Sequence, residues 1–239
     1  MMERGLVAVP CTEILWTQAA VPLFGALRSL PDSVDVRFDW CSLPTIEKRN
    51  HLVRRFLKEN SYQWLVFIDS DMVPEADSVD QLIRAGLGSE YDILGAHCYA
   101  RHHIPFRPCG GWFNGTQVTW IDEFDGAVRE VDWVGTGCVF IRRSVLQALV
   151  DRHGASGAFS APKNLSWTGR GEDQEFCRKA GELGFKIGYH TGIRFGHVGL
   201  QEIRDELVDR IDQGSPLKTR SCEFLMDAKH GGEGHTSDN

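Results

Sequence analysis

The chain has 239 residues, of which 42% are hydrophobic and 25% charged, and its formal net charge is −7. This composition is typical of one folded globular domain, and it excludes collagen-like and low-complexity chains. The acidic balance argues against non-specific nucleic-acid binding through clustered Lys and Arg, although it leaves room for a local basic groove. The apolar runs are too short to span a bilayer, and the N-terminal residues lack a signal-peptide pattern.

Seven cysteines are scattered along the sequence, and none of them forms a Cys-x-x-Cys pair. An odd number without such spacing implies neither a zinc motif nor a disulfide framework. We therefore expect reduced thiols in a cytoplasmic protein, in a host cytoplasm if the chain is encoded by a phage.

Predicted strands and helices alternate through the first hundred residues. Hydrophobic patterns predict strands at 6–9, 34–40, 64–68 and 92–96, and helices at 14–27, 44–58 and 78–87. This alternation predicts an α/β domain with a mostly parallel central sheet and helices on its faces, as in Rossmann-like folds.

The second half of the sequence has two long predicted loops, at 99–116 and 154–171. Short strands are expected at 118–120, 127–133, 138–142 and 186–189, and helices at 144–150, capped by Ser144, and at 172–183, ended by Gly184. We expect a single domain over residues 1–200. Residues 201–239 are expected to form a lid segment that closes over the ligand, followed by a flexible tail.

Five apolar residues, 64–68, lead directly into Asp69, Ser70 and Asp71. Such a run is typical of a strand buried on both faces of a parallel sheet. The two carboxylates would then lie at the carboxyl edge, where open α/β sheets bind ligands. Strand-end aspartates commonly cap a turn, but two hard oxygen ligands here also suit a divalent cation that binds a diphosphate.

Two more acidic residues, Glu172 and Asp173, begin a predicted helix. Carboxylates in a first turn stabilise the helix dipole, while one within hydrogen-bond reach of an acceptor hydroxyl would act as a general base. His197 lies between glycines near a strand end and is either structural or a metal ligand. Trp133, at the start of a Trp-Val-Gly-Thr-Gly segment, is either a core residue or a platform for a sugar ring.

In this order the segments resemble the GT-A fold glycosyltransferases of the family-two-like group. The resemblance covers residues 6 to about 200 and depends on the ordered set of short motifs. The matching segments are Val9-Pro10, Arg49-Asn50, Phe67 to Met72 with its Asp-x-Asp, Gly95-Ala96, Val134 to Gly137, Phe140 to Arg143, Glu172-Asp173 with Phe176, and Gly196-His197.

The resemblance implies a glycosyltransferase that moves a sugar from a nucleotide-diphosphate sugar to a hydroxyl of a saccharide or small molecule. It implies that Mn²⁺ or Mg²⁺ is held by Asp69, Asp71 and His197. It also implies that Asp173, beside Glu172, is the catalytic base if the enzyme inverts the anomeric centre. The residues implied for the donor pocket are Pro10, Thr12, Arg49, Asn50, Asp69, Ser70, Asp71 and Arg101, with Gly135 and Gly137 bordering the acceptor side.

Three alternatives remain open. A nucleotidyltransferase usually has a Gly-rich loop after its first strand, whereas residues 10–13 contain no glycine. A non-catalytic nucleotide- or carbohydrate-binding module would not need the intact carboxylates. A modified base in DNA is another acceptor, because interleaved basic and aromatic side chains stack bases and bind phosphates. Those side chains are Tyr99, Arg101, His102, His103, Phe106, Arg107, Trp112 and Phe113.

Overall fold

The computed structural model describes residues 3–11, 15–100, 106–115, 117–162 and 171–199, and the backbone of 202–203. The chain divides into two units between residues 204 and 205, and every described residue belongs to the first unit. The predicted lid and tail at 201–239 thus lie outside the described residues, except for the short strand at 202–203.

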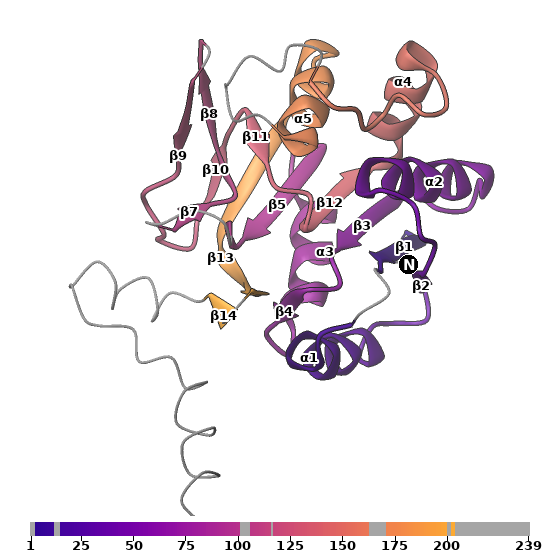
Figure 1. Cartoon of the computed structure of the whole chain (residues 1–239), viewed down its shortest axis with the longest axis vertical. Helices are drawn as coiled ribbons and strands as arrows, with labels where there is room; N and C mark the ends of the chain where they lie inside the picture. Colours follow the sequence, from indigo (N-terminus) through magenta and orange to yellow (C-terminus); the bar gives the residue numbers. More distant parts are fainter. Residues whose placement is uncertain are drawn as a thin grey trace, which may run out of the picture. The chain divides into compact units, whose positions relative to one another are not determined.

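A mixed sheet forms the centre of the first unit (Figure 1). Its strands are β1 (Gly5–Pro10), β2 (Val34–Asp39), β3 (Trp64–Ile68), β4 (Met72–Pro74), β5 (Ile93–His97), β10 (Val128–Glu130), β12 (Cys138–Arg142), β13 (Ile187–Val198) and β14 (Glu202–Ile203). The main path runs β10-β13-β5-β12-β3-β1-β2. Strands β2, β1, β3, β5 and β13 run in one direction, which confirms the predicted mostly parallel sheet.

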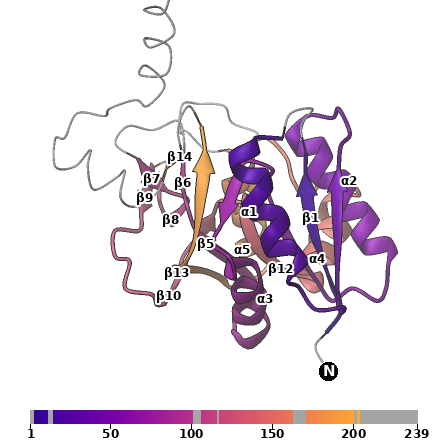
Figure 2. The same ribbon diagram turned by 90° about the horizontal axis from the view of Figure 1, so that it is seen from below.

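Helices cover both faces of this sheet. Figures 1 and 2 show α2 (Thr45–Lys58), α4 (Arg143–His153) and α5 (Glu172–Glu182) on one face, and α1 (Thr17–Arg28) and α3 (Ser78–Gly88) on the other. Side chains of β3 alternate between the two resulting cores: Leu65 and Phe67 pack with the first group, and Trp64, Val66 and Ile68 with the second. This double burial explains the uninterrupted apolar sequence of β3.

Two small sheets lie beside the central one. They contain β6 (Tyr99–Ala100) with β7 (Arg107–Pro108), and β8 (Gly110–Asn114) with β9 (Gln117–Trp120) and β11 (Trp133–Val134). The sequence predicted a loop over 99–116. Most of the described residues in this range belong to strands instead, so the prediction was wrong for them. The strand predicted at 127–133 divides into β10 and β11, which belong to different sheets.

Two further expectations differ from the structure, and the direction of one strand was not predicted. Strand β12 is antiparallel to both neighbours, β3 and β5. Strand β13 has twelve residues where four were expected, because a register shift between His190 and Arg194 lets it pair with β5 and then with β4 and β14. Helix α4 begins at Arg143 with Arg142 as its N-cap and without a side-chain cap, so Ser144 is not the cap.

None of the helices in the described residues combines the length and apolar character that crossing a membrane requires.

Candidate functional site

Asp71 and His197 face each other where β3 ends. Because β4 pairs antiparallel with β13, His197 lies opposite Met72, and the backbone N–H of Val198 donates to the carbonyl of Asp71 over 2.8 Å. The His197 Nε2 atom lies 3.5 Å from Asp71 Oδ2, and both side chains are largely buried. The structure therefore brings together two of the three residues implied as metal ligands.

A hydrogen bond at the other ring nitrogen, Nδ1, fixes the orientation of the His197 ring. Nδ1 lies 2.8 Å from the carbonyl oxygen of Tyr99, so Nδ1–H is the donor and the Nε2 lone pair faces Asp71 in the neutral ring. Metal-binding histidines are commonly held in this way, with the second nitrogen donating to a backbone carbonyl. A carboxylate oxygen and an imidazole lone pair that face each other fit a cation.

The side chain of Asp69 has a different partner from that of Asp71. Its Oδ2 atom accepts a hydrogen bond from Arg49 Nη2 over 2.8 Å. Arg49 is 2% exposed, and its guanidinium lies over the rings of Phe67 and Phe159 at 5.4 and 5.9 Å. Burial raises the pKa of Asp69, and the Arg49 charge opposes that rise. Asp69 is thus tied to an arginine rather than to His197.

Asp173 lies in the first turn of α5 and accepts a hydrogen bond from the Thr136 hydroxyl. Burial raises the pKa of Asp173 to about 6. The positive charge of Arg49 lowers this pKa, and the negative charge of Glu172 raises it. A carboxyl group with a pKa near neutrality suits proton transfer at physiological pH.

Arg49 and Thr136 connect the carboxylates of Asp69 and Asp173. Arg49 Nη1 donates to the carbonyl oxygen of Thr136 over 3.3 Å, while the hydroxyl of the same threonine binds Asp173. The sequence placed Thr136 within a motif but gave it no role of its own. The sequence signal for such a role was the position of this hydroxyl-bearing residue between two glycines.

The burial of Lys48 was also not predicted from the sequence. Its side chain is buried, and its ammonium group donates to the carbonyl of Cys11, just beyond β1. A lysine next to Arg49 on a helix gives no sequence signal for burial, because lysines at such positions are usually exposed.

Asn50 uses its whole side-chain amide to bind the protein's own backbone. Both amide hydrogens are donated, to the carbonyls of Ser156 and Phe159 at 2.9 and 2.8 Å, and Oδ1 accepts from the Phe159 N–H at 2.9 Å. The side chain fixes the segment 156–159, which holds Phe159 against Arg49. The implied place of Asn50 in the lining of the donor pocket stays a prediction.

The predicted glycines make room for the protein's own atoms. A Cβ on Gly135 would lie 2.8 Å from the Cβ of Cys109, and one on Gly137 would lie 2.6 Å from the Met72 side chain and 3.3 Å from Asp69 Oδ2. Both glycines thus permit close packing of the protein's own atoms, Gly135 against Cys109 and Gly137 against Met72 and Asp69.

The remaining predicted residues divide into described and undescribed ones. Pro10 ends β1 and Ser70 is buried beside Asp69, while Glu172 begins α5 and is half-buried. Thr12 and Arg101 lie outside the described residues. Trp133 is a core residue rather than a sugar platform. The guanidinium of Arg107, from the proposed DNA-binding loop, lies 4.8 Å from the Trp120 ring.

No family model matches the chain, and no curated protein matches its sequence. Solved structures do match its fold. A197 from STIV superposes with a TM-score of 0.55 and 19% identity over 82% of this chain and 86% of that chain. GalNAc-T7, in its crystal structure with UDP, GalNAc and Mn²⁺, superposes with a TM-score of 0.55 and 11% identity over 82% of this chain.

The chain spans 43% of the length of GalNAc-T7, and identities this low show the fold alone. The central sheet, the helices on both faces and the likeness to GalNAc-T7 agree with the fold expected from the sequence. The chain therefore has a mixed α/β fold similar to that of a GT-A glycosyltransferase.

Proposed function

We propose that the chain is a metal-dependent glycosyltransferase of the family-two-like group that uses a nucleotide-diphosphate sugar. The observation that carries this proposal is the 3.5 Å approach of His197 Nε2 to Asp71 Oδ2, with Nδ1 held by Tyr99. Asp69 and Asp71 are the acidic pair that the resemblance implies as metal ligands. They directly follow the buried strand β3 of a GT-A-like sheet. The proposal thus depends on the site geometry as well as on the fold.

Asp71 and His197 would hold Mn²⁺ or Mg²⁺, with Asp69 beside them. Bound there, the cation would stabilise the negative charge that develops on the departing nucleoside diphosphate. The remaining coordination positions suit water and diphosphate oxygens, since these ions favour oxygen ligands. Arg49 holds Asp69 in place from behind, because its guanidinium is buried and already bound to that carboxylate.

Asp173 would remove the proton from the acceptor hydroxyl. Its Oδ1 atom accepts from Thr136, which leaves Oδ2 for the acceptor. Glu172, next to it, keeps the pKa of Asp173 high and so makes the carboxylate a stronger base. These roles describe an inverting reaction.

We propose a saccharide or small molecule as the acceptor. The acidic net charge disfavours DNA, and the comparisons with solved structures give a DNA acceptor no support. Part of the basic and aromatic character of the 99–113 segment is used internally, in the contact of Arg107 with Trp120.

A donor panel tests the proposal. The full chain with Mn²⁺ is expected to release nucleoside diphosphate from at least one nucleotide sugar, and a chelator is expected to stop the release. Asp71→Ala should lower turnover at least 100-fold, on the order of the 2.7 kcal/mol or more that a lost electrostatic stabiliser costs. Asp122→Ala, which changes an exposed aspartate, should retain turnover. Tight nucleotide binding without turnover across the panel would instead indicate a binding module.

A further inference from the structure

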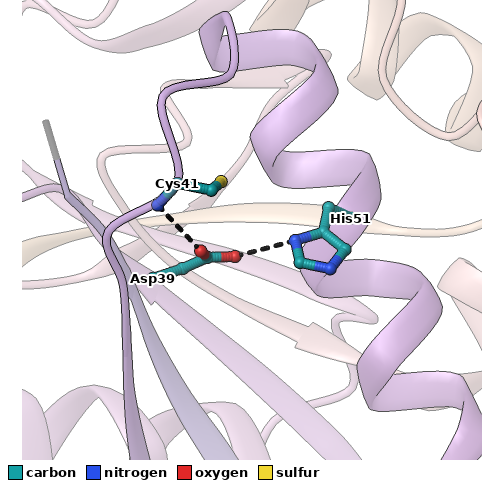
Figure 3. A group of neighbouring side chains, drawn as sticks. All are labelled: Asp39, Cys41 and His51. Atoms are coloured by element: carbon teal, nitrogen blue, oxygen red, sulfur yellow. Dashed lines mark hydrogen bonds and ion pairs between the residues drawn. The ribbon is translucent and has the colours of Figure 1, made fainter.

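A second group of ligand-type side chains lies at the end of β2. Asp39 is the last residue of that strand, Cys41 follows two residues later, and His51 projects from α2 (Figure 3). Asp39 Oδ2 lies 3.0 Å from His51 Nδ1, and Asp39 Oδ1 accepts from the Cys41 backbone N–H over 3.2 Å. One carboxylate oxygen, the Cys41 Sγ and one His51 ring nitrogen lie within 4.8 Å of one another.

We propose that Asp39, Cys41 and His51 form a second metal site, which binds Zn²⁺ or a similar borderline ion. A thiolate, an imidazole and a carboxylate are the three ligand types that zinc accepts, at about 2.0–2.3 Å each. Ligands at these lengths lie roughly 3 to 4 Å apart around a tetrahedral ion, so the observed separations need only small side-chain rotations. Mg²⁺ and Mn²⁺, which favour oxygen, suit this set less well.

Burial and access both fit an ion at this place. Asp39 is 6% exposed, so its carboxylate is held by the fold, whereas the His51 side chain is 33% exposed and gives an ion a route from solvent. Asp39 and the Cys41 thiolate would balance the two positive charges, and the thiol proton would pass to solvent on binding. The nearby ammonium group of Lys48 is already bound to the Cys11 carbonyl.

Three protein ligands leave a fourth position open. Closed structural zinc sites use four protein ligands, while sites with three keep a position for water or another small ligand. The ion would also join the end of β2 to α2, the helix whose Arg49 binds Asp69. This site goes beyond the proposed transferase function, which depends on other side chains.

Cobalt titration of the metal-free full chain tests the proposal. We expect one Co²⁺ to bind with a sulfur-to-metal charge-transfer band, and Zn²⁺ to displace it. Cys41→Ser should abolish that band, and His51→Ala should weaken cobalt binding at least tenfold. Cys109→Ser, at another half-buried free cysteine, should leave the band unchanged, which excludes a contribution from that thiol.

Asp71→Ala separates this site from the proposed catalytic one. The charge-transfer band should persist in that variant, because the thiolate remains, even if turnover is lost. Zinc should also raise the Tm of the wild-type chain and of Asp71→Ala, and should raise that of Cys41→Ser by less, since an ion that binds only the folded state stabilises it. Absence of a thiolate band in the wild type, or its persistence in Cys41→Ser, would overturn the proposal.

Discussion

At the scale of single residues, the charge state of Asp173 depends on opposing influences. Burial raises the pKa of its carboxyl group to about 6, with Glu172 acting in the same direction, while Arg49 and Thr136 favour the charged form. A base must be deprotonated to accept a proton. We therefore expect turnover to fall as the pH drops through about 6, measured at saturating Mn²⁺ and donor so that metal binding does not limit the rate.

The same raised pKa predicts an effect on stability. The folded chain binds the Asp173 proton more tightly than the unfolded chain, whose carboxyl has an ordinary pKa of 3.8. The ionised group therefore lowers the free energy of unfolding at neutral pH. Asp173→Asn should remove turnover but raise the Tm at pH 7, and the gain in Tm should shrink as the pH falls from 6 toward 4. Asp122→Asn, at an exposed position, should show neither effect.

Thr136 has a role that can be separated from simple packing. Thr136→Val keeps the shape of the side chain but removes the hydrogen bond to Asp173. Because that bond lowers the pKa of Asp173, its loss should move the acid limb of the pH profile to higher pH. A hydrogen bond to a charged group contributes about 1.5–3 kcal/mol, so kcat should fall by a factor of roughly 10 to 100. Thr136→Ser should restore both the pH profile and kcat. An unchanged pH profile in Thr136→Val would contradict the assigned role.

At the scale of elements, the sequence predicted β1 to β3 and the helices between them because strong hydrophobic periodicity and turn residues mark their limits. It did not predict the length of β13, whose sequence contains several glycines and histidines and has a register shift at His190. The three-residue strand β4 has too few residues for a periodic pattern. Yet these two strands bring His197 to Asp71, so the position of the proposed metal ligand was known only from the resemblance.

Helix α3 provides a paired test of how the helices pack on the sheet. A Cβ on Gly86 would lie 2.4 Å from the Phe140 ring of β12, whereas one on Gly88 would meet nothing within 4 Å. Gly86→Ala should lower the free energy of unfolding by about 1–3 kcal/mol, the usual cost of overpacking. Gly88→Ala should be neutral or slightly stabilising, because alanine favours the helix. Equal effects of the two changes in denaturant unfolding would contradict the observed packing of α3.

At the scale of the whole molecule, the alternation of elements was sufficient to predict an α/β fold with helices on both faces of the sheet. It was not sufficient to predict the antiparallel β12, since strand direction follows from long-range pairing that hydrophobic periodicity does not record. The site shows the same limit. Acidic residues at strand and helix ends were found from the sequence, but the link through Arg49 and Thr136 depends on contacts between segments far apart in the chain.

Asp71 and His197 are proposed to hold together the cation that assists departure of a nucleoside diphosphate. The most direct measurement is Mn²⁺ binding to the full chain, followed by electron paramagnetic resonance with and without a nucleoside diphosphate. We expect the nucleotide to tighten Mn²⁺ binding in the wild type. Asp71→Asn and His197→Gln should each weaken this binding at least tenfold, whereas Asp122→Asn should not. Undiminished Mn²⁺ binding by correctly folded Asp71→Asn protein would contradict this proposal.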